Sequence, residues 1–318
     1  MFEGLCISAD LFFDRSTGSI PSPPEHGAVL RQNSCYMDKN SRAMMATERR
    51  KMETRDIWTI TDRDILYEDE AMIAIEKPYG LPSQPTLDPK RDNAYAAVMR
   101  HCAQSGGYAA LHHRLDALTS GILVLAKSKE ANPSLSDQFQ KHTIRKTYVA
   151  ICAMPHGVCP KYRTPGASWI IDAPIGEAKP DEARSMAMAR GAKKSPKMQM
   201  FSTTGKNRKP AKTRVFCERI VEFREGYIGV YRCEPITGRT HQIRVHLSSC
   251  ELYIVEDPLY GMKFRSIQSI TPGRMCLHAE AISLLHPVTQ EPMTLTSPRP
   301  VAFERFMAKA ERMARASS

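Results

Sequence analysis

The strongest strand pattern in the chain is a short apolar run, Ile-Leu-Val-Leu-Ala at residues 122–126, enclosed by Gly121 and Lys127. A short run of branched apolar residues between turn signals is typical of a buried strand. The preceding residues, 112–121, read His-His-Arg-Leu-Asp-Ala-Leu-Thr-Ser-Gly, which places Asp116 on the loop that leads into this strand. Such a carboxylate is held by a rigid scaffold and is still open to a ligand. Taken alone, the spacing fits a structural salt bridge at a turn equally well.

Further apolar runs predict more strands than helices. Strands are predicted at residues 65–67, 72–75, 144–152, 215–223 and 227–233. Helices are predicted after an Asn93 cap, at residues 129–142, at 240–247 with Thr240 as its cap, and from residue 301 onward. Short turns join neighbouring strands, which favours antiparallel pairing. We therefore predict an α+β fold, with a mixed, largely antiparallel central sheet and flanking helices.

The same pattern divides the chain into segments. Residues 1–56 lack sustained periodicity and a signal-peptide core, so we predict a partly disordered N-terminal extension. A folded domain is predicted over residues 57–305, and residues 306–318 are predicted to form a C-terminal tail. Within the domain, the basic segment at about 179–212 is interpreted as a loop insertion that contacts phosphates, with a solvated linker as the alternative.

Charge and cysteine content narrow the range of partners. The net charge of +11 and the pI near 9.2 favour a polyanionic partner such as RNA or DNA over a merely soluble basic protein. No apolar stretch reaches the roughly 18 residues of a membrane span. The nine cysteines form no CxxC pair, which argues against a zinc site or a disulfide framework and for a reducing compartment, cytoplasmic or organellar. His112, His113 and Asp116 are conceivable metal ligands, but nothing else in the sequence supports a metal site.

The loop sequence HRLDALTSG, residues 113–121, resembles the catalytic-loop motif of the RluA family of RNA pseudouridine synthases. Other segments match that family in the expected order, and the last of them matches more weakly. They are KPYGLPSQP at 77–85, KTYVA at 146–150, GRTHQIRVHL at 238–247, DPLYG at 257–261 and LHAEAISLLHP at 277–287. The similarity covers roughly residues 60–300, and an ordered set of motifs is far more specific than any one of them.

The resemblance implies a pseudouridine synthase fold with a central catalytic cleft. It also implies an enzyme, monomeric by default, that isomerises specific uridines in ribosomal or transfer RNA without a cofactor or metal. By the same resemblance Asp116 is the catalytic nucleophile or base, Arg244 is its partner, and Tyr148 contacts the target base. The residues expected to bind substrate or RNA are His113, Arg114, Thr119, Lys146, Arg239, His241 and Gln242.

These residue types suit the chemistry that the resemblance implies. Breaking the bond from uracil N1 to the ribose and rejoining the base through C5 requires a carboxylate near the sugar and the base. Two opposite charges about 4 Å apart attract by roughly 4 kcal/mol at an effective dielectric constant near 20, so Arg244 should keep Asp116 ionised. Desolvation offsets much of that attraction. Tyr148 would offer the extruded base a stacking surface, and Arg114 would help to fill the space that the base leaves.

Two other classes of function are compatible with the same sequence features. One is a non-catalytic RNA-binding or ribosome-assembly factor on the same fold, which the intact Asp116, Tyr148 and Arg244 disfavour. The other is a glycoside hydrolase, which needs a second acid that the motifs do not offer. One departure from the family concerns Glu256, which stands where a glycine usually precedes the DPLYG segment. A glycine there would allow backbone angles that a glutamate rarely takes.

Overall fold

Strands dominate the structure, as the apolar pattern predicts. The computed structural model describes residues 57–103, 107–189 and 198–317. They belong to one compact unit, Met44–Ser318. The predicted extension at residues 1–56 lies outside the described residues. None of the described helices is both long and apolar enough to cross a membrane.

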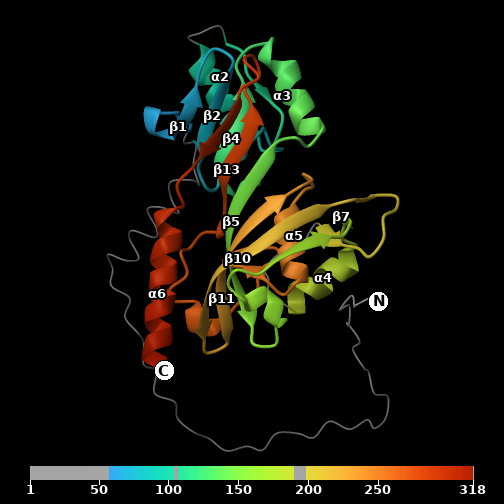
Figure 1. Cartoon of the computed structure of the whole chain (residues 1–318), viewed down its shortest axis with the longest axis vertical. Coiled ribbons are helices and arrows are strands. Elements are labelled where there is room, and N and C mark those ends of the chain that lie inside the picture. The colour runs from blue at the N-terminus through green and yellow to red at the C-terminus, as the bar shows by residue number, and fades with distance from the viewer. Residues whose placement is uncertain (1–56, 104–106, 190–197, 318) are drawn as a thin grey trace, which may run out of the picture. The chain divides into compact units, whose positions relative to one another are not determined.

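Within the part of the chain that the structure describes, the main sheet has eleven strands. Figure 1 labels most strands of its main path. Its main path, in spatial order, is β1 (Ile65–Glu68), β2 (Met72–Lys77), β4 (Ser120–Ala126), β13 (Leu277–Leu285), β5 (Arg145–Pro155), β11 (Gly226–Pro235), β10 (Lys212–Phe223) and β6 (Ser168–Asp172). Three short strands pair with β4, β5 and β13, respectively: β3 (Ala110–Leu111), β12 (Tyr253–Ile254) and β14 (Pro292–Thr296). Within the described ranges, β4 and β13 are parallel and every other pair of this sheet is antiparallel. The predicted α+β fold on a mixed, largely antiparallel sheet is confirmed.

The helices and a second sheet complete the described fold. The helices are α2 (Ala94–Cys102), α3 (Ala131–Gln140), α4 (Pro180–Ala189), α5 (Gln242–Ser249) and α6 (Val301–Ser317). Short 3-10 turns lie at η1 (Asp62–Asp64), η3 (Pro160–Arg163) and η4 (Arg265–Ile267). The second sheet orders β8 (Met198–Met200), β7 (Ile175–Glu177) and β9 (Arg208–Lys209). The predicted cap of α2 is confirmed, because Asn93 Oδ1 accepts the Ala96 N–H at 3.0 Å.

Strand β4 is buried on both faces, which explains its unbroken apolar run. Ile122 and Val124 pack in one core cluster with Leu135 of α3. Leu123 and Leu125 alternate with them and pack in another cluster, beside α2. A strand packed on both faces cannot shift without breaking two sets of contacts, so the loop that precedes it is firmly anchored.

Gly121 is required where this loop enters the sheet. Its φ of 109° lies in a region that favours glycine, and a Cβ there would overlap the backbone of Ala279 in β13. Gly121 pairs with Ala279 in the parallel register of β4 and β13. The last residue of the HRLDALTSG motif therefore allows the close approach of these two strands.

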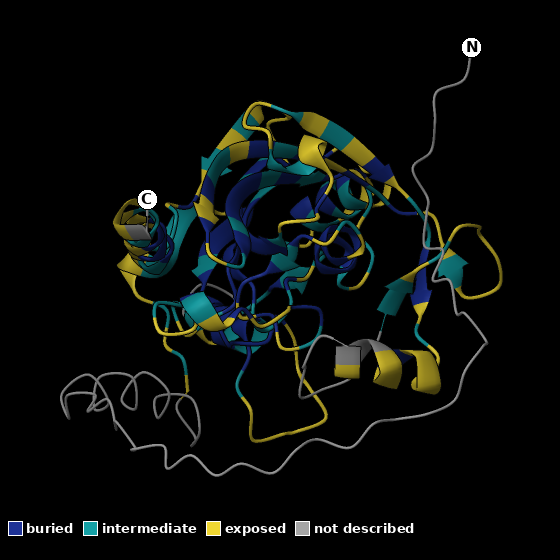
Figure 2. Cartoon of the chain, turned by 90° about the horizontal axis from the view of Figure 1, so that it is seen from below, coloured by how far each residue is buried: buried dark blue, intermediate teal, exposed yellow. Residues whose placement is uncertain are grey.

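Three local expectations require correction. The segment at 179–212 is not simply a loop, because it includes α4, β8, β9 and the start of β10, although residues 190–197 lie outside the described residues. Residues 306–317 are not a tail, because α6 continues through them and buries one face against the core, as Figure 2 shows. Helix α5 begins at Gln242 with His241, not Thr240, at its N-cap.

Candidate active site

A cleft of about 840 Å³ collects the segments that carry the matched motifs. The loops at 82–86 and 111–119 form part of its lining, the segment at 235–244 forms another part, and Lys146 and Tyr148 of β5 contribute as well. These segments are distant in sequence and meet because β4, β5 and β11 lie in one sheet. All ten predicted site residues line this cleft.

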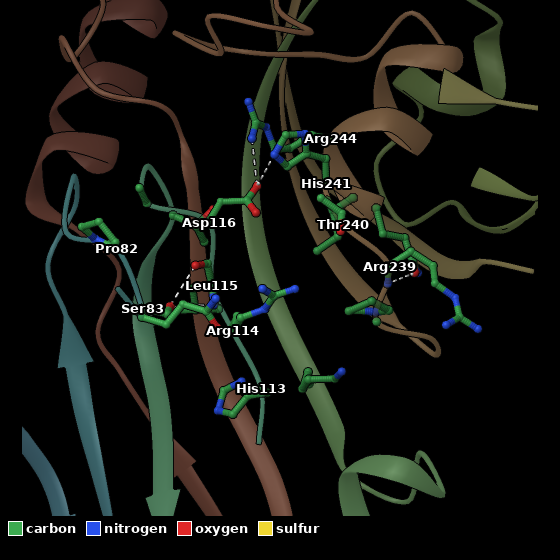
Figure 3. Close-up of a pocket in the computed structure, with 18 of the residues that line it drawn as sticks. Pro82, Ser83, His113, Arg114, Leu115, Asp116, Arg239, Thr240, His241 and Arg244 are labelled. Atoms are coloured by element: carbon green, nitrogen blue, oxygen red, sulfur yellow. Dashed lines mark hydrogen bonds and ion pairs between the residues drawn. The ribbon is translucent and has the colours of Figure 1, made fainter. Parts of the chain in front are cut away.

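Asp116 lies on the loop before β4 and is partly exposed to the cleft, with 26% of its side chain accessible. Its backbone carbonyl accepts the N–H of Thr119 at 3.0 Å, which closes a turn. The Thr119 side chain is buried, and its backbone N–H is the donor of this turn. The carboxylate is thus fixed by its loop and directed toward α5, as Figure 3 shows.

Arg244 joins two carboxylates from its position on α5. Its Nη1 donates to Asp116 Oδ2 at 2.8 Å, while its Nε and Nη2 donate to Asp257 Oδ2 and Oδ1, both at 2.7 Å. Burial acts to lower the pKa of Arg244, but the hydrogen bonds and charges of Asp257 and Asp116 outweigh it and raise that pKa above its ordinary value. Arg244 is therefore a permanent cation beside Asp116. The expected pairing of these two residues is present, and Arg244 is buried rather than on the helix surface.

Tyr148 and Lys146 extend from β5 into the same cleft. Burial, and then the charge of Asp116, raise the pKa of the Tyr148 hydroxyl above its ordinary value, so it stays protonated at neutral pH. Burial lowers the pKa of Lys146. An aromatic ring thus stands in the cleft that holds the carboxylate, where a base could stack on it.

His241 lies beside the Asp116–Arg244 pair. Its Nε2 is 3.9 Å from Asp116 Oδ2, and its Nδ1 is 2.9 Å from the hydroxyl of Tyr260. Its backbone is left-handed, with φ of 57°, an uncommon conformation for a residue with a side chain. This conformation ends the preceding loop and starts α5 with the imidazole facing the cleft (Figure 3).

The remaining predicted RNA-binding residues fall into two groups. Arg114 is exposed and extends from the Asp116 loop into the cleft, and Arg239 stands across from it in Figure 3. By contrast, His113 Nε2 accepts the Val124 N–H at 2.9 Å, and its ring stacks on a phenylalanine. Gln242 is buried and hydrogen-bonded through both of its side-chain polar atoms to other parts of the chain. The hydrogen bonds of both side chains within the chain fit a structural role, and the direct RNA contact of His113 and Gln242 stays a prediction.

Three residues of the site were not predicted. Asp257 supports Arg244, Tyr260 contacts His241, and Lys77 donates to the carbonyls of Pro78, Leu81 and Ala117 behind the Asp116 loop. Burial lowers the pKa of Lys77 to about 7. All three stand in the quoted KPYGLPSQP and DPLYG motifs, so a signal was present. Only the folded chain shows what each one contacts.

Among the described residues, no group of three or more His, Cys, Asp or Glu side chains is arranged to hold a metal ion. His112 and His113, considered above as conceivable ligands, both stack on Phe139, with ring centroids 6.3 and 4.6 Å from it. These two imidazoles thus pack against an aromatic side chain that lines the cleft with them.

Comparison with known proteins places this arrangement in a family. The family model for RNA pseudouridylate synthases matches residues 71–249. The chain is 32% identical to the ribosomal large subunit pseudouridine synthase D of Pseudomonas aeruginosa, over 87% of this chain and 80% of that protein. It is also 32% identical to the dual-specificity RNA pseudouridine synthase RluA of Haemophilus ducreyi, over 73% of this chain and 91% of that protein.

Two further comparisons define the reach of this similarity. The chain is 32% identical to an uncharacterized RNA pseudouridine synthase of Mycoplasma pneumoniae over 72% of this chain, and the match spans 64% of that relative's length. Among solved structures, human RNA pseudouridylate synthase domain containing 1 aligns with a TM-score of 0.55 at 22% identity, over 77% of this chain and 86% of that one. The structural similarity shows the fold, and the sequence similarity shows the family. The chain belongs to the RluA-type family of RNA pseudouridylate synthases.

Proposed function

We propose that this protein is an RNA pseudouridine synthase in which Asp116 acts on a uridine extruded into the cleft. The observation that carries the proposal is the partly exposed Asp116 carboxylate, held by buried Arg244 at 2.8 Å in a cleft lined by the family motifs. A carboxylate paired with a permanent cation serves as a nucleophile or base and is a poor general acid. Tyr148 lines the same cleft and supplies a stacking surface for the base.

The proposed substrate is ribosomal or transfer RNA. A relative with similarity over most of both chains is named for the large ribosomal subunit. The net charge of +11 supports a polyanionic substrate, and Arg114 and Arg239 bring part of that charge to the cleft. A uridine within a stem cannot present its sugar and both base edges, so the reaction requires extrusion of the nucleotide. We propose that the chain does this as a monomer.

The test replaces Asp116 with asparagine, which keeps the size of the side chain and removes its charge. Unmodified transcripts of the ribosomal and transfer RNAs of the source organism are incubated with each protein, and pseudouridine is measured by carbodiimide labelling. We expect Asp116→Asn to form no pseudouridine while it still binds RNA and folds. The matched control is Asp137→Asn, which removes an exposed carboxylate on α3 and should retain full activity.

Three results would contradict the proposal. Full activity of Asp116→Asn would remove the assigned role of that residue. Absence of pseudouridine with the wild-type protein, together with tight RNA binding, would favour a non-catalytic RNA-binding factor. Release of free uracil from the RNA would indicate hydrolysis of the glycosidic bond in place of isomerisation.

A further inference from the structure

The hydrogen bonds around His241 determine which of its nitrogens carries the proton. The Tyr260 hydroxyl oxygen accepts the backbone N–H of Met198 at 3.1 Å and lies 2.9 Å from His241 Nδ1. Among the described residues these are the two hydrogen-bond partners of that hydroxyl. Burial raises the pKa of Tyr260 to about 12, so the hydroxyl keeps its proton at neutral pH. When the hydroxyl proton is directed to Nδ1, that nitrogen is the acceptor and the His241 proton lies on Nε2.

The protonated Nε2 faces the reacting part of the cleft. It lies 3.9 Å from Asp116 Oδ2, an oxygen that already accepts a hydrogen bond from Arg244. The imidazole is mostly buried, with 13% of the side chain exposed, and His241 lines the cleft. The Nε2 N–H is thus directed to the part of the cleft where a nucleotide on which Asp116 acts would lie.

The proposed reaction creates an acceptor at that place. When the bond between uracil N1 and ribose C1′ breaks, the bonding electron pair leaves with the base, and the negative charge spreads to the uracil carbonyl oxygens. The 2-carbonyl oxygen is bonded to the carbon next to N1, so it lies beside the breaking bond. A fixed N–H donor at that oxygen stabilises the departing base more than it stabilises the bound substrate.

We propose that His241 donates a hydrogen bond from Nε2 to the 2-carbonyl oxygen of the target uracil, and that Tyr260 is the positioning residue that fixes this tautomer. No proton is transferred by His241 in this role. The proposal rests on the proposed function, because it assigns a part of that same reaction. The proposal also assigns a role to the second sheet, because the Met198 N–H that orients the Tyr260 hydroxyl belongs to β8.

Two variants of His241 distinguish a donor at Nε2 from mere filling of space. The amide nitrogen of glutamine reaches about the position of imidazole Nε2, whereas that of asparagine matches Nδ1. We expect His241→Ala and His241→Asn to lower the single-turnover rate of pseudouridine formation roughly 10- to 100-fold. RNA affinity should change far less than this rate, and His241→Gln should retain most of the rate. The matched controls, His156→Asn and His156→Gln, alter an exposed histidine outside the cleft lining and should behave like wild type.

A second pair of variants tests the tautomer itself. Tyr260→Phe removes the hydroxyl but keeps the ring, so the rate should fall in an otherwise wild-type protein. An amide has no tautomers, so adding Tyr260→Phe to His241→Gln should cause no further loss of rate. RNA carrying 2-thiouridine at the modified position offers a weaker acceptor and should react more slowly with the wild type. It should cause no additional loss with His241→Ala.

These experiments test the role of His241 independently of the proposed function. Equal rates for His241→Asn and His241→Gln, in variants that unfold at the wild-type temperature, would overturn it. So would a loss confined to RNA affinity, or an equal effect of Tyr260→Phe in both backgrounds. If the wild type forms pseudouridine and Asp116→Asn does not, the function stands whatever His241 does.

Discussion

Asp257 holds the Arg244 guanidinium through two hydrogen bonds of 2.7 Å, and neither side chain is appreciably exposed. Asp257 Oδ1 also accepts the backbone N–H groups of Leu259 and Tyr260 at 2.9 and 3.1 Å. One carboxylate thus fixes both the cation that faces Asp116 and the turn that carries Tyr260. The third donor of Arg244, Nη1, is left directed at Asp116.

Asp257→Ala should therefore lower both stability and activity. Removing one partner leaves the buried Arg244 charge without its bidentate acceptor, which costs about 3–5 kcal/mol in the free energy of unfolding. Urea denaturation measures this loss, and the pseudouridine assay measures the activity. Asp172→Ala is the control, because it removes an exposed ion pair with Lys212 and should cost at most about 1 kcal/mol. Equal losses for the two variants would show that the buried pair does not support the site.

Local spacing predicted much of this fold. The apolar runs located β1, β2, β4, β5, β10 and β11, because the strand period of two and the turn signals depend only on neighbouring residues. The buried face of α6 was also within reach. Phe303, Phe306, Met307 and Ala310 recur at helical spacing and are all buried, so the tail prediction missed an available signal.

Contacts between residues that are distant in the sequence could not be predicted from the spacing of neighbouring residues. Asp116 and Arg244 are 128 positions apart, and only the resemblance to a family joined them. Asp257 and Tyr260 were visible as part of a motif, but their roles depend on which side chains the sheet brings beside them. The contact of His113 could not be predicted either. In the folded chain its imidazole accepts a hydrogen bond from the Val124 N–H.

His113 and Arg114 are adjacent and should respond differently to alanine. Arg114→Ala should weaken RNA binding and reduce the slope of log affinity against log salt by about 1, with little change in stability. His113→Ala leaves the Val124 N–H without its acceptor and should cost about 1–3 kcal/mol in unfolding free energy. Its salt slope should match wild type. RNA titrations at several KCl concentrations and urea denaturation measure both, and a reduced slope for His113→Ala would restore its direct contact with RNA.

Glu256 occupies a left-handed backbone position, with φ of 59°. The family's usual glycine would adopt this conformation without strain, whereas for a residue with a Cβ the conformation is unfavourable by roughly 1–2 kcal/mol. Glycine also loses more freedom on folding, so Glu256→Gly should stabilise the protein by about 0.5–1 kcal/mol. The midpoint of urea denaturation reports the gain. Glu256→Ala removes the charge and keeps the strain, so an equal gain in that variant would attribute the effect to charge.

Burial of His278 should make the free energy of unfolding fall at acidic pH. It is fully buried in β13, where Nδ1 contacts Ser120 Oγ at 2.8 Å and Nε2 contacts Ser297 Oγ at 3.1 Å. Burial, and then the charge of Arg274, lower its pKa to about 4, against about 6.5 in the unfolded chain. Between these values the unfolded state binds the proton and the folded state does not, so stability is lost as the pH falls from 6.5 toward 4.

The measurement is the unfolding free energy of wild type and His278→Gln at pH 7.5 and at pH 5. Glutamine does not titrate in this range, and every other ionisable group is common to both proteins, so their contributions largely cancel in the comparison. The glutamine variant should be less stable at pH 7.5, because it cannot reproduce both serine contacts with the imidazole geometry. The wild type should then lose about 2 kcal/mol more than the variant between the two pH values. Parallel pH profiles would mean that His278 takes up a proton in the folded protein, and that the serine contacts rearrange to hold an imidazolium beside Arg274.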